Sequence, residues 1–182
     1  MNQTSKFSVR DICYAGLFAA VIAVMAQISI PMPLGVPMTM QTFAITLAAV
    51  VLGSKLSAIA TLVYLLLGAV GVPVLANFQG GPSAIFGKTG GYAIGYILTA
   101  LITALLSKVL GRKFWALCVA MVVGCAACYV LGTIWFMILT GADLVSALGW
   151  CVLPYLPGDA VKIALASALT IQLDKRLKGS LV

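Results

Sequence analysis

The chain contains no histidine and no glutamate, and its only acidic residues are four aspartates among 182 residues. Histidine and glutamate supply most general bases in enzymes, and two-metal sites need clusters of acidic residues. Their absence argues against a membrane enzyme such as a transferase acting on lipid-linked substrates. We therefore expect a protein that is not an enzyme and has no cofactor and no metal site.

Charge of either sign is also scarce. Charged residues make up 8% of the chain and hydrophobic residues 63%, whereas about a quarter of an ordinary soluble domain is charged. This composition predicts a single integral membrane domain over residues 1–182. We expect no cleaved signal peptide, because the first apolar segment is longer than a signal h-region and no convincing cleavage site follows it.

The five cysteines lie mostly within apolar segments. They are therefore interpreted as small buried hydrophobic residues rather than as a disulfide framework. Cys125 and Cys128 form a CxxC pattern, but a redox role is not expected in an apolar segment at lipid depth. The net charge of +7 does not predict nucleic-acid binding either, because the basic residues neither cluster on one face nor alternate with aromatic residues.

The apolar runs predict an all-α protein with six transmembrane helices. They lie near Val9–Ile30, Met40–Leu52, Leu56–Val70, Tyr92–Val109, Phe114–Leu139 and Ala160–Leu173. A helical span needs about 20 apolar residues, so the second and third runs are short. Either they cross the bilayer with help from their flanks, or one of them is re-entrant.

Basic residues indicate the orientation of the helices. When alternate connections are assigned to opposite sides, nine of the eleven basic residues fall on one side, which the positive-inside rule makes cytoplasmic. These nine are Lys6, Arg10, Lys55, Lys108, Arg112, Lys113, Lys175, Arg176 and Lys178. We expect both termini in the cytoplasm of a multi-pass cell-membrane protein, and the long connections Pro31 to Thr39, Gly71 to Gly91 and Thr140 to Gly158 outside.

Asp159 and Lys162 stand three residues apart in the last apolar segment, within the sequence LPGDAVK. Asp159 alone could simply cap a helix. A lysine one turn further on the same helix face would have to be desolvated or reach outward, so together the two predict a ligand-binding pair. A carboxylate accepts hydrogen bonds and an ammonium donates to a carbonyl, which suits a nearly neutral, cyclic urea-like or amide-like ligand.

The glycine-rich second outer connection does not match a phosphate-binding loop. Five residues separate Gly81 from Gly87 where that motif has four, and position 82 is proline. Nucleotide binding is therefore not expected. The amides of Gly90, Gly91 and Tyr92, at the start of the fourth helix, are candidates for binding a carboxylate.

Other polar residues of the outer connections could complete a pocket. Lys88 could reinforce carboxylate binding or could be a solvated lysine. Asn77 and Gln79 can both donate and accept. The uncharged first connection could form an apolar lid over a ligand, with Gln41 and Thr42 at the start of the second helix, or could simply pack at the membrane interface. Aromatic walls are available from Phe78, Tyr92, Trp135, Trp150 and Tyr155.

The first helix carries Ala15, Ala19 and Ala23 at four-residue spacing, with Gly16 and Ala20 beside them. Small residues in register allow close helix packing in lipid. The stripe is explained either by packing within the molecule or by docking of another membrane subunit.

Four segments resemble the BioY family, the biotin-specific substrate-binding components (S components) of energy-coupling factor (ECF) transporters. They are PMTMQTF (37–43), LLLGAVGVPV (65–74), GKTGGY (87–92) and LPYLPGDAVK (153–162). The last is the most specific, and the similarity extends over nearly the whole chain.

The resemblance implies a six-helix protein that captures biotin from outside and has no hydrolytic activity of its own. It implies docking through the first helix onto a transmembrane coupling subunit powered by two cytoplasmic ATPases. It also implies that Asp159 and Lys162 bind the biotin head group. The family often has proline where this chain has Lys88, which makes Gly90 and Gly91 the better carboxylate candidates.

Two other readings remain open from the sequence. The chain could be an S component for another vitamin, such as thiamine or riboflavin. It could also be a self-sufficient, proton-coupled secondary transporter, because a membrane-embedded aspartate and lysine can carry protons. The absence of evident inverted halves argues against the second reading.

Overall fold

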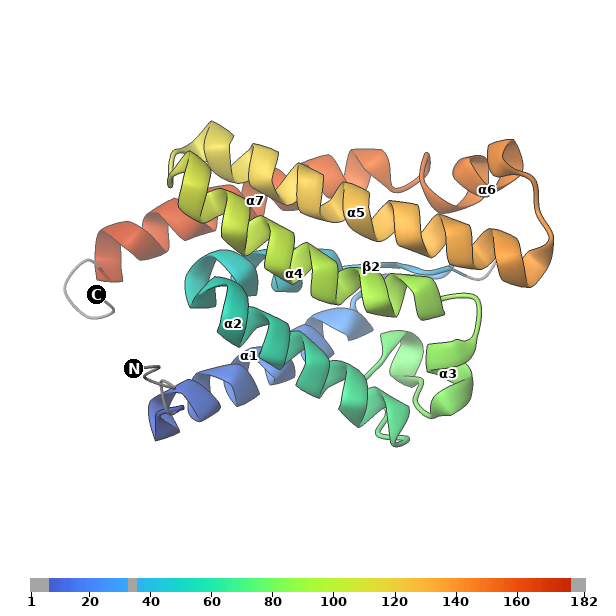
Figure 1. Ribbon diagram of the computed structural model, residues 1–182, viewed down its shortest axis with the longest axis horizontal. Helices are drawn as coiled ribbons and strands as arrows, with labels where there is room; N and C mark the ends of the chain where they lie inside the picture. Colours follow the sequence, from blue (N-terminus) through green and yellow to red (C-terminus); the bar gives the residue numbers. More distant parts are fainter. Residues whose placement is uncertain (1–6, 33–35, 178–182) are drawn as a thin grey trace, which may run out of the picture.

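The computed structural model describes residues 7–32 and 36–177, and within them the chain is predominantly helical (Figure 1). Lys6 and Lys178, which the charge argument counted, lie outside the described residues, as does part of the first long connection. The elements are α1 (Val9–Gln27), β1 (Ser29–Ile30), β2 (Met38–Thr39), α2 (Gln41–Ala69), η1 (Ala76–Phe78), α3 (Pro82–Phe86), α4 (Gly90–Leu110), α5 (Phe114–Thr140), α6 (Leu144–Cys151) and α7 (Leu156–Leu177).

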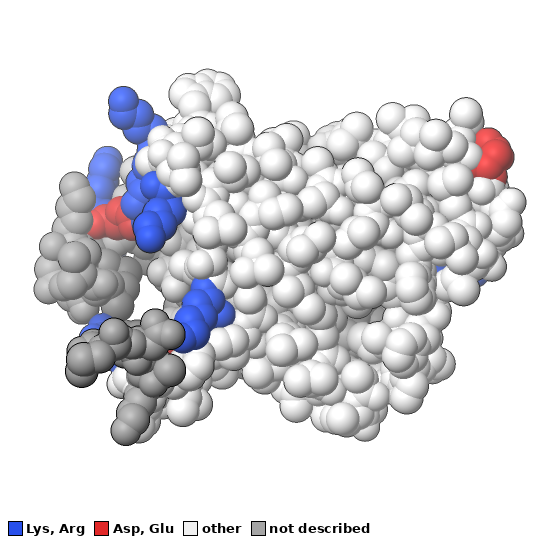
Figure 2. Space-filling model, in the orientation of Figure 1, with Lys and Arg blue, Asp and Glu red and all other residues white. Residues whose placement is uncertain are grey.

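The long helices run along the length of the molecule, and the distribution of charge follows that direction. The start of α1 and the end of α7 lie at one end of the molecule, whereas α3 and α6 lie at the other (Figure 1). On the face seen in Figure 2, lysine and arginine gather at the end that holds the start of α1. The surface between the two ends is almost free of charge, as expected of a bundle that crosses a bilayer.

Four of the described helices are long and apolar enough to cross a membrane, namely α1, α2, α4 and α5. The pair α6 and α7, which meets at a bend of 48°, meets the same criterion when the two are taken together. The structure therefore contains four to five candidate spans.

Helix α2 is interrupted at Gly53, whose φ of 78° and ψ of 176° are not helical. The Gln41 side chain donates a hydrogen bond to the Tyr64 hydroxyl, although 23 residues of straight helix would extend about 35 Å. The element therefore folds back on itself as two antiparallel arms. These arms correspond to the second and third apolar runs, and the break between them lies where the sequence predicts it.

Helices α4 and α5 approach each other closely through glycines of both helices. A Cβ at Gly95 would lie 2.7 Å from the Cys128 sulfur, and one at Gly132 would lie 2.3 Å from the Tyr92 ring. A Cβ at Gly124 would lie 2.2 Å from the Thr103 hydroxyl. Such separations exclude any side chain, so the seam between α4 and α5 depends on its glycines.

Two connections are more ordered than the sequence predicts. The first contains a short antiparallel pair in which Ser29 is opposite Thr39, a small departure from the all-α expectation. The third contains α6, capped by the Asp143 side chain, which accepts from the Ser146 amide. Helix α7 also begins at Leu156 rather than at Ala160, because proline is tolerated in the first turn of a helix.

Candidate ligand-binding site

Asp159 and Lys162 are both buried, with exposed fractions of 5% and 8%. Asp159 lies in the first turn of α7 and Lys162 one turn later, so their side chains share a face. The Lys162 Nζ donates to the Asp159 Oδ1 over 2.8 Å. The predicted pair is therefore a buried ion pair that faces the protein interior rather than lipid or water.

Residues from two other elements complete the hydrogen bonding of this pair. The Tyr129 hydroxyl, on α5, donates to the second carboxylate oxygen of Asp159. The Lys162 ammonium also donates to the Thr39 carbonyl of β2 over 2.7 Å. A buried charge pair is tolerated only where further hydrogen bonds compensate for lost hydration, and here α5 and β2 provide them.

Two adjoining cavities lie beside the ion pair. The small cavity, about 40 Å³, is lined by Asp159 and Lys162 together with Tyr129 and other aromatic, thiol and hydroxyl side chains. The large cavity, about 290 Å³, extends toward η1 and α3. Val36, Pro37, Tyr92 and Tyr96 line both cavities. Together they form one site with a charged end and a wider, mixed polar and apolar end.

The small cavity contains polar groups that no described residue satisfies. The Thr42 Oγ1 and the Tyr92 hydroxyl are buried, and within residues 7–32 and 36–177 neither has a hydrogen-bond partner. Both residues line the small cavity. Since nearly all buried polar atoms in proteins are paired, these two hydroxyls are available to a ligand.

Gln41 is buried and is held by three other side chains. Its Oε1 accepts from the Thr39 hydroxyl over 2.8 Å and from the Tyr96 hydroxyl over 3.1 Å, while its Nε2 donates to Tyr64. Gln41 lines the large cavity and Thr39 the small one. The network therefore connects the two cavities and fixes the orientation of the Gln41 amide.

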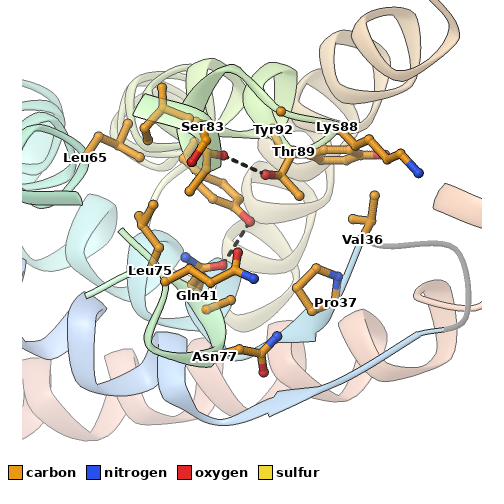
Figure 3. Close-up of a pocket in the computed structure, with 17 residues that line it drawn as sticks. Val36, Pro37, Gln41, Leu65, Leu75, Asn77, Ser83, Lys88, Thr89 and Tyr92 are labelled. Carbon is orange, nitrogen blue, oxygen red and sulfur yellow. Dashed lines mark hydrogen bonds between the residues drawn. The ribbon is translucent and has the colours of Figure 1, made fainter. Parts of the chain in front are cut away.

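Several residues that the sequence predicts to bind the ligand lie at the rim of the large cavity. Figure 3 shows Gln41, Asn77 and Lys88 around it, with Lys88 on the opposite side from Leu65 in this view. Asn77, Gln79 and Lys88 are exposed and line the cavity. Asn77 has a left-handed backbone with φ of 58°, and its Oδ1 accepts from the Ser29 hydroxyl over 2.5 Å.

Gly90 and Gly91 have a different environment from the one expected. Neither is among the residues that line the two cavities. A Cβ at Gly91 would lie 2.3 Å from the Trp135 Cβ, and the Gly90 amide already donates to the Gly87 carbonyl over 3.0 Å. The structure gives these glycines a packing role at the start of α4, whereas the neighbouring Tyr92 side chain does reach the site.

The alanine stripe of α1 is largely internal. Ala15 and Ala19 are 5% and 3% exposed, and Ala23 is half-buried against the same core. Gly16 and Ala20 are exposed instead, and a Cβ at Gly16 would meet nothing within 4 Å. Ala15 and Ala19 therefore pack within the molecule, which is one of the two explanations that the sequence left open, and docking through the stripe stays a prediction.

Some residues that hold the candidate site in place were not identified from the sequence. Tyr129 lies in an apolar helix. The signal available in the sequence was that a buried tyrosine hydroxyl usually needs a hydrogen-bond partner. Thr39 contributes its backbone carbonyl to Lys162, which no side-chain pattern reveals. Gln27 ends α1, and its polarity in an apolar helix was the available signal. Its side chain bonds the carbonyls of Val74 and Leu75 and the Phe78 amide over 2.9–3.1 Å.

A buried ion pair at the wall of a cavity, inside a bundle of apolar helices, defines a membrane protein that binds a small solute. The sequence matches the BioY family over residues 1–179, and the chain belongs to that family. The family is that of a transporter component and not of an enzyme.

Relatives of known name and structure agree with this assignment. The chain is 38% identical to the biotin transporter BioY of Thermotoga maritima, over 92% of this chain and 97% of that protein. It is 36% identical to the probable biotin transporter BioY of Pyrococcus horikoshii, over 94% and 98% of the two chains. A crystal structure of the S component for biotin from an ECF-type ABC transporter matches with a TM-score of 0.84 and 26% identity, covering 96% of this chain and 95% of that chain.

Proposed function

We propose that this chain captures biotin as the substrate-binding component of an ECF-type importer. The observation that carries the proposal is the buried pair of Asp159 and Lys162 at the wall of a cavity with unpaired hydroxyls. The bicyclic head of biotin contains a neutral urea. Its N–H groups suit the Asp159 carboxylate and its carbonyl oxygen suits the Lys162 ammonium or a hydroxyl such as Thr42.

The large cavity is the proposed site for the tail of biotin. Its wall combines apolar side chains such as Leu65 and Leu75 with the polar rim of Asn77 and Lys88. The apolar wall suits the methylene chain, and Lys88 and Asn77 suit the terminal carboxylate. Because the Gly90 amide is already engaged, we assign the carboxylate to Lys88 and Asn77 rather than to Gly90 and Gly91.

We further propose that the chain crosses the membrane six times with both termini in the cytoplasm. The break at Gly53 supports this count, because each arm of α2 would then be one short span. The basic residues at the end that holds the start of α1 and the end of α7 support the orientation. On this orientation the ligand cavities lie toward the outside.

We propose a transmembrane coupling subunit and two cytoplasmic ATPases as partners. The proposed contact for the coupling subunit is the exposed face of α1 around Gly16 and Ala20. Small residues four apart allow a partner helix to approach closely, and Gly16 has free space around it.

The proposal is tested by titrating biotin into the purified protein by isothermal calorimetry. We expect saturable binding and a loss of affinity of about 30-fold or more in Asp159→Asn and in Lys162→Ala, because each leaves a buried charge without its partner. Asp143→Asn is the matched control, since Asp143 is exposed and asparagine is an equally good helix cap.

Unchanged affinity in both site variants would remove the site assignment. Competition distinguishes the vitamins: thiamine or riboflavin that displaces biotin at equal concentration would contradict biotin specificity. Riboflavin carried through purification would also colour the protein yellow.

A further inference from the structure

A third cavity, of about 510 Å³, lies at the opposite end of the molecule from the ligand site. It opens between the break in α2 and the end of α4, and we call it the basic-end cavity. Its lining includes Gly53 and Ser54 on one side and Leu105, Lys108 and Arg112 on the other. It shares no lining residue with the two cavities of the ligand site.

Two basic side chains line this cavity. Lys108 lies in the last turn of α4 and is exposed, and it forms no hydrogen bond or ion pair with the described residues. The Arg112 Nε–H donates a hydrogen bond to the Asp174 carboxylate over 2.5 Å. This bond holds the guanidinium in place and leaves its two terminal nitrogens available. The pair provides a mobile ammonium and an oriented guanidinium, a combination that suits a phosphate.

The backbone next to these cations also favours an anion. Because Gly53 is not helical, the second arm of α2 starts at Ser54. The first amides of this arm have no carbonyl of a preceding helical turn to bond. The positive end of that arm's dipole therefore lies at the cavity wall. The Ser54 hydroxyl adds a further hydrogen-bonding group.

The rest of the cavity is apolar. Val50, Val51, Leu52 and Leu105 are part of its lining. Beside it, the outward surface of α4 exposes Leu105, Val109 and Leu110 by 53%, 80% and 47%. A small inorganic anion would contact the cations and leave this surface unused. A molecule with both a phosphate and hydrocarbon chains would use both parts.

The charge of this end is strongly positive. Seven described basic residues (Arg10, Lys55, Lys108, Arg112, Lys113, Lys175, Arg176) stand against two aspartates there, Asp11 and Asp174. Figure 2 shows this concentration at the point where the uncharged lateral surface ends. That is the depth of lipid headgroups for a bundle that spans a bilayer, and basic pockets at this depth bind anionic lipids.

We propose that the basic-end cavity binds one anionic phospholipid. Its phosphate would lie at Lys108 and Arg112, and the parts of its acyl chains nearest the headgroup would lie against Leu105 and Val109. The inference goes beyond the capture of biotin and does not depend on which solute the ligand site holds. It adds a structural lipid site at the end of the protein that faces away from the ligand.

Native mass spectrometry of the purified protein tests the site. The protein is released from micelles that contain equal amounts of phosphatidylglycerol and phosphatidylcholine with identical acyl chains. We expect one phosphatidylglycerol to be retained in preference to phosphatidylcholine. Lys108→Gln keeps the ion pair of Arg112 and should reduce this retention about fivefold, the effect of one basic side chain near an anionic headgroup.

Lys113→Gln is the matched control, because Lys113 is an exposed lysine at the same end that does not line the cavity. It should retain the lipid as the parent protein does, and thermal unfolding checks that both variants are folded. Equal retention of the two lipids, or equal loss in both variants, would overturn the proposal.

Two further outcomes separate a lipid from other occupants. Glycerol 3-phosphate has the phosphate but no acyl chain; if it displaces the lipid at equal concentration, the site binds the phosphate alone and the lipid assignment is overturned. If Lys108→Gln keeps the lipid but no longer assembles with the coupling subunit, the cavity is a protein contact and the proposal is also overturned.

Discussion

At the scale of residues, the proposed ligand site is organised around two charges that the protein keeps out of water. Asp159 and Lys162 would destabilise the fold if either stood alone, since a buried unpaired charge costs several kcal/mol. Tyr129 and Thr39 supply the hydrogen bonds that offset this cost. The same contacts hold the two side chains in position before a ligand arrives, which reduces the entropy lost on binding.

Tyr129→Phe should lower biotin affinity at least about tenfold. It removes the hydroxyl that positions the Asp159 carboxylate, and a hydrogen bond to a charged group is worth about 1.5–3 kcal/mol. The measurement is a calorimetric titration. Tyr14→Phe is the control, because the Tyr14 hydroxyl accepts a hydrogen bond from Arg10 on the exposed side of α1 and does not line either ligand cavity. Equal affinities in the two variants would show that Tyr129 does not support the site.

The sequence predicted the buried pair but not its surroundings. Opposite charges at helical spacing in an apolar segment were sufficient to nominate Asp159 and Lys162, because lipid makes such residues costly. The partner carbonyl of Thr39 lies 123 residues from Lys162 along the chain, and backbone atoms carry no residue-specific signal. Gly90 and Gly91 were nominated for their free amides, but the nearness of Trp135 could not be deduced without the packing of α4 on α5.

At the scale of elements, the loop that borders the large cavity is held by the end of α1. Gln27 bonds two carbonyls and one amide within residues 74–78, and Ser29 bonds Asn77. These contacts keep Asn77 and Phe78 in left-handed backbone conformations, which non-glycine residues rarely adopt. The position of the cavity rim therefore depends on α1.

Gln27→Ala should weaken biotin binding about tenfold, because each lost hydrogen bond contributes about 1 kcal/mol and the rim would relax. Limited proteolysis should show faster cleavage within residues 71–80 than in the parent protein. Gln172→Ala, on an exposed position of α7, should change neither. Wild-type affinity together with wild-type proteolysis in Gln27→Ala would contradict this role for α1.

The break in α2 leads to a second prediction at this scale. Gly53→Ala should reduce the free energy of unfolding by about 1–3 kcal/mol, since its φ and ψ are essentially restricted to glycine. Thermal unfolding in detergent is the measurement. Gly149→Ala is the control: it also has free space for a Cβ, but it lies within α6, where alanine is the better helix former. A smaller loss at Gly53 than at Gly149 would mean that the break is not required.

The sequence predicted the long helices but not the short elements. Long apolar runs indicated α1, α4 and α5, and the gap between the runs that end at Leu52 and start at Leu56 indicated the turn within α2. Helix α6 was missed because a helix of eight residues in a connection has too few turns for a periodic pattern. The strand pair is shorter still, and it forms because Thr39 and its neighbours are held against α7.

At the scale of the whole molecule, the two ends of the bundle have different chemistry. One end is basic and carries both the start of α1 and the end of α7 (Figures 1 and 2). The other carries α3, α6 and the two cavities of the candidate site. The exposed surface of α1 extends between them, so a partner on α1 could influence the cavity rim through Gln27.

Gly16→Leu should abolish or strongly reduce assembly with the coupling subunit while leaving biotin affinity unchanged. A leucine at this position meets no atom of the folded chain but would obstruct a helix packed against it. Co-purification with the coupling subunit is the measurement. Ala126→Leu, on an exposed position of α5, is the control. Normal assembly of the Gly16 variant would place the docking surface elsewhere.

Vesicles that contain only this chain should bind biotin without accumulating it against a gradient. A proton-driven cycle would require a state with neutral Asp159, and that state would leave Lys162 a buried cation without its partner. Uptake of radiolabelled biotin with and without an imposed proton gradient is the measurement. Accumulation that stops when the gradient is dissipated would identify a secondary transporter instead.

The glycine seam between α4 and α5 determines where this protein can be redesigned. Every position of that seam where a Cβ would collide is closed to variation, and because Gly132 packs against the Tyr92 ring, that part of the aromatic wall is held in place. The opposite wall is closed at the buried Leu65 and Leu75, but Asn77 and Gln79 on the same side are exposed. Libraries that seek recognition of new vitamins should therefore randomise those exposed positions and leave the aromatic wall untouched.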